Sequence, residues 1–344
     1  MKPQTLQKTA LALLVGWYAA NAAAYSEQGQ AGNTKSWESA EYLKDWGLTS
    51  MNASTAYALG FNGSGVKIGV MDSGVLLNHP EFQDGRIHVV KTEGTYSKDG
   101  MRYPDASVGN GPINKNEPVK NGKRNFDKTD NGIFTKGEAF NIDGAWHKYT
   151  NDAHGTHVGG TMAASRDGNE MHGVAFGANL YSANTGGNDN MTYGPNQDYS
   201  FFLQGYSALA DAGAKVINNS WGSNRRVNSS FAGALGYKPK YDWRDVPEYG
   251  VQYYDVPKAP EPISSPAAHI YLSNLGEAEK AYYQFVTSGE KNFIDAAYEV
   301  AKNKQVIQVF TAGNRSMMAE SFTRAMLPYF RPDVEKYWVN VTGQ

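Results

Sequence analysis

The chain of 344 residues contains no cysteine. That absence excludes disulfide bridges, a thiol nucleophile and zinc sites built on thiolates. An excess of positive charge is also missing, because 32 Lys and Arg stand against 34 Asp and Glu and give a formal net charge of −2. Nucleic acid is therefore not expected as a partner. The apolar stretch that begins at Ala10 falls short of the about 18 residues that a membrane-spanning helix needs.

Residues that build a folded core are plentiful. The sequence has 7 Trp, 22 Tyr and 14 Phe, and 40% of its residues are hydrophobic. A disordered, solvated chain carries far fewer aromatic residues. The 37 glycines predict many tight turns and close backbone approaches. The length suits one or two domains.

The first 24 residues have the organisation of a secretory signal. Lys2 and Lys8 give the N-terminal segment positive charge, an apolar stretch follows from Ala10, and small residues occur up to Ala24. This order of charge, apolar residues and small residues is typical of a cleaved signal peptide. We therefore expect residues 1–24 to be removed, and the protein to be secreted or held at a bacterial cell surface.

Strand and helix patterns alternate from residue 67 onward. The expected strands are 67–71, 180–183, 215–220, 305–311 and 337–343, and the expected helices are 154–164, 201–212 and 293–301. Such alternation predicts an α/β fold with a parallel sheet covered on both faces. Two stretches, residues 91–150 and 224–287, are rich in Gly, Asn, Pro and Tyr with little periodicity. We expect both to be long surface insertions.

Three segments carry polar residues at the end of an expected strand or the start of an expected helix, where α/β sheets bind ligands. Asp72 follows the strand 67–71, His154 opens a helix, and Asn314 follows the strand 305–311. A carboxylate can orient a histidine base, an imidazole can accept a proton, and an amide can donate to an oxyanion. Taken singly, each residue also has a simpler interpretation as a turn or helix-capping residue.

A metal site is an alternative for the two histidines of the segment that begins at His154. His154 and His157 are three residues apart, with Gly155 and Thr156 between them. A hydrolytic zinc helix spaces its histidines four apart and places a glutamate between them. The spacing disfavours a metal ligand pair, so we predict no metal site. His157 is expected either to pack against its neighbours or to support a neighbouring functional residue.

Together, and in this order, the segments resemble the subtilisin-like serine proteases (peptidase S8). The matching segments are Val66–Gly74 with His79 and Pro80 just after, His154–Thr161, Gly173–Ala175, Val216–Gly222 and Ala312–Asn314. The resemblance implies a three-layer α/β/α fold with a mainly parallel sheet. The expected organisation is a signal peptide (1–24), a lead-in (25–45) and an incomplete peptidase domain (46–344).

The resemblance also implies a serine endopeptidase that acts on peptide or protein substrates. Asp72 corresponds to the acid of the catalytic triad, His154 to its general base, and Asn314 to the side-chain donor of the oxyanion hole. The residues that correspond to the substrate-binding strand, which pairs with an extended peptide, are Ser220, Trp221 and Gly222. No cofactor is required, although the family resemblance admits a structural calcium ion, for which the sequence assigns no ligands.

The N-terminal part has a narrower resemblance. Ala31–Asn33, Ser36–Glu38, Asp45–Leu48 and Met51–Ala53 are similar to the start of bacterial autotransporter subtilases. In those proteins the protease follows the signal peptide almost directly, and a C-terminal β-barrel sits in the outer membrane. A membrane is expected as a partner only through such a barrel, which the 344 residues do not include.

The family's nucleophile lies in a Gly-Thr-Ser-x-x-x-Pro segment, and this sequence contains no Gly-Thr-Ser. We therefore expect the chain to be the N-terminal part of a protease, cut before its nucleophile and inactive as it stands. The alternative is an exported, non-catalytic peptide-binding or adhesive protein on a degenerate protease scaffold. Such a protein would keep the edge Ser220–Gly222 but would gain nothing from Asp72, His154 and Asn314.

Overall fold

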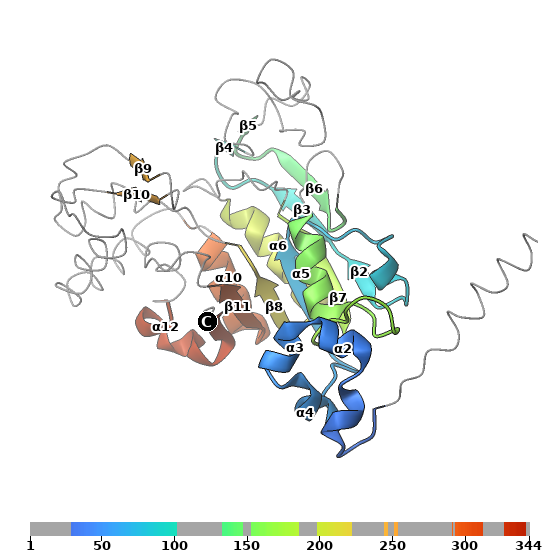
Figure 1. The fold of residues 1–344 in the computed structure, drawn as a ribbon. Coiled ribbons are helices and arrows are strands. Elements are labelled where there is room, and N and C mark those ends of the chain that lie inside the picture. Colours follow the sequence, from blue (N-terminus) through green and yellow to red (C-terminus); the bar gives the residue numbers. More distant parts are fainter. Residues whose placement is uncertain are drawn as a thin grey trace, which may run out of the picture. The chain divides into compact units, whose positions relative to one another are not determined.

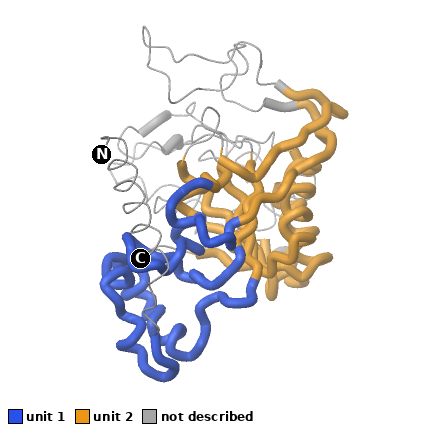
Figure 2. Tube along the Cα trace, turned by 90° about the vertical axis from the view of Figure 1, so that its right-hand side faces the viewer, with its two compact units in different colours: residues 1–66, 78–87, 159–179 blue, residues 67–77, 88–158, 180–344 orange. Residues whose placement is uncertain are grey.

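The structure is a computed structural model (Figure 1). It describes residues 29–101, 133–146, 153–185, 198–221, 244–246, 251–253, 291, 293–311 and 327–341. The chain divides into two compact units (Figure 2): unit 1 comprises residues 1–66, 78–87 and 159–179, and unit 2 comprises residues 67–77, 88–158 and 180–344. Neither unit is a continuous stretch of sequence, because the chain passes between them several times.

A six-stranded sheet, built almost wholly from unit 2, has the strand order β12-β11-β8-β1-β7-β2. Its strands are β1 (Lys67–Asp72), β2 (Ile87–Val89), β7 (Asn179–Asn184), β8 (Val216–Asn219), β11 (Ile307–Thr311) and β12 (Trp338–Val341). The pairs β1–β8, β8–β11 and β11–β12 are parallel. The expected α/β class with a mainly parallel sheet is confirmed.

β1 lies inside this sheet, between β8 and β7. Every residue of β1 after Lys67 is buried, which explains why its sequence is a continuous apolar run and not an alternation. The strand ends at Asp72, at the carboxyl edge of the sheet. That edge is where open α/β sheets bind ligands.

The expected helices are present as α5 (His154–Ala163), α6 (Tyr199–Asp211) and α10 (Phe293–Lys304). The Asp198 side chain caps α6 by accepting the N–H of Phe201 at 2.9 Å. α6 packs against α10 and against β1. Buried residues of the shared core include Phe202, Tyr206, Leu209, Ile217, Ile294 and Phe310. In the described part of the chain, no helix is both long and apolar enough to cross a membrane.

Antiparallel ribbons occupy parts of the two predicted insertions. β3 (Lys91–Thr95) pairs with β6 (Ala139–Asp143), and β4 (Gly100–Met101) pairs with β5 (Ile133–Phe134). β9 (Arg244–Val246) pairs with β10 (Val251–Tyr253). Tyr96 and Phe134 stack at 3.9 Å and join the core of unit 2. The 91–150 segment is thus anchored near both of its ends. Two further short helices in the described part of unit 2 are α12 (Leu327–Phe330) and η4 (Pro332–Tyr337).

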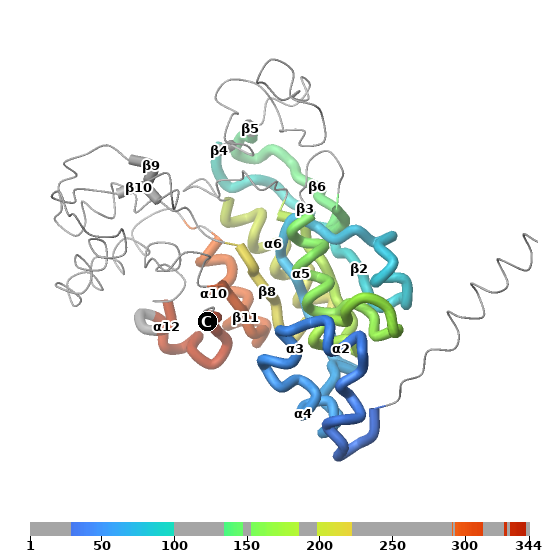
Figure 3. Tube along the Cα trace, viewed as in Figure 1, coloured from blue at the N-terminus to red at the C-terminus, as the bar shows by residue number. Residues whose placement is uncertain are grey.

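Unit 1 begins with short helices, which Figure 3 traces in blue. They are η1 (Thr34–Trp37), α2 (Ala40–Lys44), α3 (Trp46–Ser50) and α4 (Ala53–Ala58), and η2 (Pro80–Phe82) belongs to the same unit. The Ser39 hydroxyl accepts the N–H of Tyr42, and the Asp45 carboxylate accepts that of Gly47. Tyr42 packs with Leu48, Ala53 and Tyr57. The segment predicted as a lead-in therefore contributes helices to a core from Thr34 onward.

Candidate active site

Asp72 and His154 meet in unit 2, although 82 residues separate them in sequence. Asp72 is the last residue of β1 and His154 is the first of α5. The His154 Nδ1 atom lies 2.8 Å from Asp72 Oδ1. The Asp72 side chain is 3% exposed, whereas the His154 side chain is 44% exposed. The pair therefore combines a buried acid with an imidazole that a reacting group can reach.

This geometry determines which ring nitrogen of His154 carries the hydrogen. An ionised carboxylate only accepts hydrogen bonds, so Nδ1 is the donor and the neutral ring presents the lone pair of Nε2. A carboxylate in this position also stabilises the imidazolium that forms when Nε2 takes up a proton. The arrangement can therefore accept a proton from a substrate or nucleophile and return it.

Several contacts fix the carboxylate of Asp72. Its Oδ1 atom also accepts the N–H of Ser73 at 2.7 Å. The Asp72 backbone carbonyl accepts the N–H of Thr185, which follows β7, at 2.7 Å. Oδ2 is buried and has no hydrogen-bond partner among the residues that the structure describes. Two donors on Oδ1 thus hold the carboxylate in the orientation that faces the histidine.

Glycines allow α5 to approach the turn after Asp72. A Cβ atom added to Gly155 would lie 2.5 Å from the carbonyl oxygen of Gly74, closer than real Cβ contacts. Gly74 itself has φ of 88°, in the left-handed region that favours glycine. Side chains at positions 74 and 155 would push His154 away from Asp72.

Two hydroxyl groups bind the same turn to the helix. The Ser73 hydroxyl accepts the N–H of Gly155 at 2.9 Å, and the Thr156 hydroxyl accepts the N–H of Leu76 at 3.0 Å. Sequence reasoning did not assign either role. The available signal was the presence of a serine directly after the acid and a threonine two residues after the histidine.

His157 is exposed, so it does not pack in the core, and the other expectation, that it supports a neighbouring functional residue, stays a prediction. It lies on the same helix as His154, whereas its neighbours Val158 and Gly159 are among the residues that α5 buries. Within the described residues there is no group of three or more His, Asp or Glu side chains arranged to hold a metal ion. The structural calcium ion that the family resemblance admits stays a prediction, and the described residues assign it no ligands.

The residues predicted to bind substrate follow the end of β8. Ser220 Oγ accepts a hydrogen bond from the Asn218 side chain at 2.7 Å. The Trp221 side chain is only 9% exposed and points into the core, so a substrate would meet the backbone of this segment and not the indole. Substrate binding here remains a prediction. Gly222 and Asn314 lie outside the described residues.

The Trp221 ring packs among three phenylalanines. Its ring centroid lies 5.8 Å from Phe202, 5.3 Å from Phe293 and 6.3 Å from Phe310. The indole therefore belongs to the aromatic core of unit 2.

The sequence of this chain is similar to those of known proteins. Residues 63–343 match the model of the subtilase family, Peptidase_S8. The chain is similar to an extracellular serine protease of Serratia marcescens, at 29% identity over 98% of this chain and 26% of that protein. It is also similar to bacillopeptidase F of Bacillus subtilis (strain 168), at 28% identity over 75% of this chain and 16% of that protein.

The chain thus spans about a quarter or less of the length of these curated relatives. Among solved structures, fervidolysin of Fervidobacterium pennivorans is 19% identical, covers 80% of this chain with 26% of its own, and has a TM-score of 0.35.

The family match covers most of the chain and contains both Asp72 and His154. The parallel sheet, with an acid at the end of an inner strand and a histidine at the start of a helix, agrees with it. This chain belongs to the subtilase family.

Proposed function

We propose that this chain is the N-terminal part of a secreted serine endopeptidase in which Asp72 is the acid and His154 the general base of a catalytic triad. The observation that carries this proposal is the 2.8 Å contact between His154 Nδ1 and Asp72 Oδ1, with the imidazole exposed and the carboxylate buried. A buried acid that orients an accessible histidine is the arrangement that activates a serine.

The chemistry follows from the two side chains. His154 Nε2 takes the proton of a serine hydroxyl while the serine oxygen attacks the peptide carbonyl carbon. The same nitrogen then gives that proton to the leaving amine, and the C–N bond breaks to leave an acyl-enzyme. Water repeats both steps and releases the acid product. Asp72 stabilises the imidazolium throughout, and we assign to the Asn314 amide a hydrogen bond to the oxyanion worth about 3–4 kcal/mol.

The nucleophile is the part of this triad that the 344 residues do not contain. The sequence holds no Gly-Thr-Ser, so we propose that the serine belongs to sequence beyond Gln344. The oxyanion hole is then incomplete as well, because a backbone N–H of the nucleophile segment is its usual second donor. We expect residues 25–344 alone to be inactive.

Secretion is the second element of the proposal. Residues 1–24 have the charge and apolar pattern of a signal peptide, and one relative is named an extracellular serine protease. The substrate would be a peptide or protein that lies in extended form along Ser220–Gly222. The bacterial autotransporter subtype is proposed from the segments between Ala31 and Ala53 alone.

The test is hydrolysis of peptide substrates by the protein as it is secreted, with matched variants of two histidines on one helix. We expect His154→Ala to lower kcat by about 10⁶-fold and His157→Ala, at an exposed position, to leave it near the wild-type value. Equal activity of the two variants would overturn the assignment. The non-catalytic alternative expects no hydrolysis by any form and retention of peptide by all of them.

A further inference from the structure

A buried hydrogen bond connects Trp221 to the strand that carries Asp72. The indole N–H of Trp221 donates to the backbone carbonyl of Met71 at 2.7 Å, across 150 residues of sequence. Met71 is fully buried and directly precedes Asp72. A neutral hydrogen bond of this kind contributes about 1 kcal/mol when formed, and its loss leaves a buried carbonyl unpaired.

The position of this bond in the sheet is informative. The parallel pairing of β1 with β8 runs from Ile68 opposite Val216 to Val70 opposite Asn218 and then stops. Beyond that point the backbone of β8 no longer pairs with β1. The indole supplies the donor for the next carbonyl, that of Met71. The Trp221 side chain thus binds β1 at the point where the backbone pairing of β1 with β8 ends.

The other side of β1 is held as well. The carbonyl of Asp72 accepts the N–H of Thr185 at 2.7 Å, on the β7 side of the strand. The last two carbonyls of β1 therefore each have a partner from the segment that follows a different neighbouring strand. The partner on the β8 side is a side chain, so a substitution can remove it without changing the backbone.

The segment that carries the indole is itself firmly held. Asn219, two residues before Trp221, is fully buried. Its side-chain amide donates to Gln308 Oε1 at 3.0 Å, and its Oδ1 accepts the hydroxyl hydrogen of Tyr206 at 2.9 Å. Both polar atoms of the Asn219 side chain thus have partners, and buried hydrogen bonds of this kind rigidify the core around them. Together with the three phenylalanines around the ring, they leave the indole little freedom to follow a displaced strand end.

We propose that Trp221 is a positioning residue for the Asp72–His154 pair. Its indole N–H holds the end of β1 so that Asp72 Oδ1 remains within hydrogen-bond distance of His154. The inference rests on the proposed function, because a proton-transfer site is what requires this alignment, and small displacements of a reacting group are costly. The indole of Trp221 touches neither the substrate nor the reacting atoms, and it acts through the backbone of Met71.

The test uses the 344-residue chain, because its readout does not need a nucleophile. A histidine N–H that donates to a carboxylate gives a low-field proton NMR signal, and its loss in His154→Ala assigns the signal to this residue. We expect Trp221→Phe to displace the signal or broaden it beyond detection. The matched control is Trp338→Phe, which changes a core tryptophan that is 6% exposed and stacks on Phe310 at 4.8 Å. The control should keep the signal in place.

A second variant separates the hydrogen bond from the packing of the ring. Replacing Trp221 by β-(3-benzothienyl)alanine puts sulfur where the indole has N–H and keeps the bicyclic shape, so it also decides the matter if Trp221→Phe does not fold. A displaced or lost His154 signal in this variant supports the inference. An unchanged signal overturns it and leaves the proposed function intact. A wild-type chain without any His154 signal would contradict both, because the pair itself would not be formed.

Discussion

Each unit of the molecule contains a buried carboxylate oxygen without a hydrogen-bond partner in the described part of the chain: Asp72 Oδ2 in unit 2 and Glu81 Oε2 in unit 1. Their surroundings differ, because hydrogen-bond donors face the carboxylate of Asp72, whereas negatively charged side chains lie near that of Glu81. The other oxygen of Asp72 accepts N–H bonds from a histidine and from the backbone. Burial, together with the negative charges of Asp167, Glu41 and Glu170, raises the pKa of Glu81 to about 7.

The comparison shows that burial alone does not give a carboxylate a function. A carboxylate that faces a hydrogen-bond donor can orient that donor and stabilise positive charge on it. A carboxylate that faces other acids instead holds its proton up to neutral pH and costs stability when it loses it. We therefore propose that Asp72 orients the histidine base, and that Glu81 makes the stability of unit 1 depend on pH.

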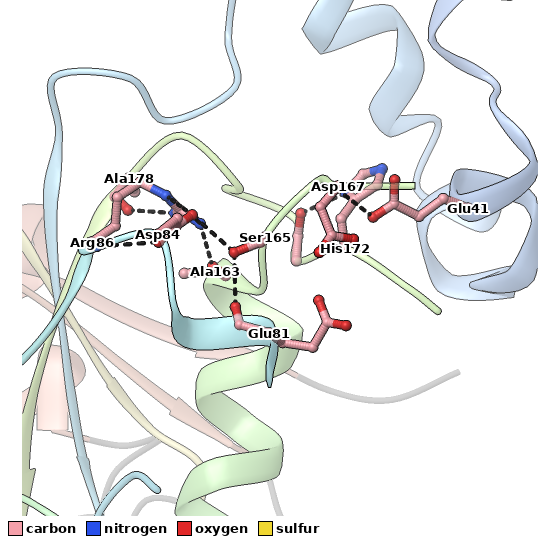
Figure 4. A network of polar contacts seen from close by, with 10 residues as sticks. Glu41, Glu81, Asp84, Arg86, Ala163, Ser165, Asp167, His172 and Ala178 are labelled. Carbon is pink, nitrogen blue, oxygen red and sulfur yellow. Dashed lines mark hydrogen bonds and ion pairs between the residues drawn. The ribbon is translucent and has the colours of Figure 1, made fainter. Parts of the chain in front are cut away.

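The neighbours of Glu81 also show how unit 1 accommodates a second acid (Figure 4). Glu41 is 1% exposed, and its carboxylate accepts the N–H groups of Asp167 at 3.2 Å and Gly168 at 2.9 Å. Burial raises the pKa of Glu41, and these two backbone hydrogen bonds counteract part of that effect. Backbone N–H groups thus stabilise the charged form of Glu41, whereas no hydrogen-bond donor among the described residues reaches Glu81 Oε2.

Ser165, two residues before Asp167, binds the segment around Glu81. Its hydroxyl lies 2.9 Å from the carbonyl oxygen of Glu81 and 2.8 Å from Asp84 Oδ2. Arg86 in turn binds Asp84 and the carbonyl of Ala178 (Figure 4). A change in the charge of Glu81 is therefore expected to act on a connected part of unit 1.

The largest expected difference between the two carboxylates is in catalysis. In the secreted protein, we expect Asp72→Asn to lower kcat by about 10⁴-fold, because an amide favours the wrong imidazole tautomer. Glu81→Gln makes the same change from carboxylate to amide at the half-buried Glu81 and should leave kcat within a few-fold of wild type. Steady-state kinetics on a peptide substrate measures both. A comparable loss in the two variants would mean that the contrast drawn here is wrong.

The next effect is on the stability of unit 1. We expect Glu41→Ala to lower the free energy of unfolding by about 2 kcal/mol, because the N–H groups of Asp167 and Gly168 lose a buried acceptor. Glu38→Ala is the matched control, since Glu38 forms an ion pair with the exposed Lys35 and such pairs contribute about 0–1 kcal/mol. Urea unfolding of both variants decides the matter, and equal midpoints would refute the role given to Glu41.

The smallest expected effect is the pH dependence that Glu81 produces. Its pKa is raised from 4.5 to about 7 in the folded protein, so the folded state binds this proton more tightly than the unfolded chain. The stability contribution is present below pH 4.5 and is lost as the pH rises to about 7. After allowance for solvent screening, the loss is of order 1 kcal/mol.

Glu81→Gln isolates that contribution. The variant should remove the fall in stability between these pH values and should unfold at higher temperature than wild type at pH 8. Thermal unfolding at pH 5 and pH 8 gives the comparison. A wild-type protein that becomes more stable over this range, relative to Glu81→Gln, would show that the sign is wrong.

The sequence was sufficient to predict the elements that bear Asp72 and His154. Both residues lie at element ends that local patterns mark, an apolar strand and a helix start rich in small residues. The position of His157 was not predictable in the same way. Spacing along a helix states which residues share a face, but only the packing of α5 decides which face is buried.

Contacts between distant segments account for the rest of what was missed. The bond from Trp221 to Met71 depends on where the pairing of β1 and β8 stops, which no local pattern records. The raised pKa of Glu81 likewise depends on the negative charges of Asp167, Glu41 and Glu170, which are distant in sequence. Such effects arise from tertiary proximity, so the sequence gives the residue types but not the charges that face them.

The central claim is that Asp72 and His154 serve a serine that lies outside these 344 residues. The most direct test is to label the secreted protein with a fluorophosphonate and to map the modified residue by mass spectrometry. The account predicts a single label on the serine of a Gly-Thr-Ser-x-x-x-Pro segment beyond Gln344, no label on residues 25–344 alone, and loss of the label in His154→Ala. Stoichiometric labelling of a serine within residues 25–344 would contradict it.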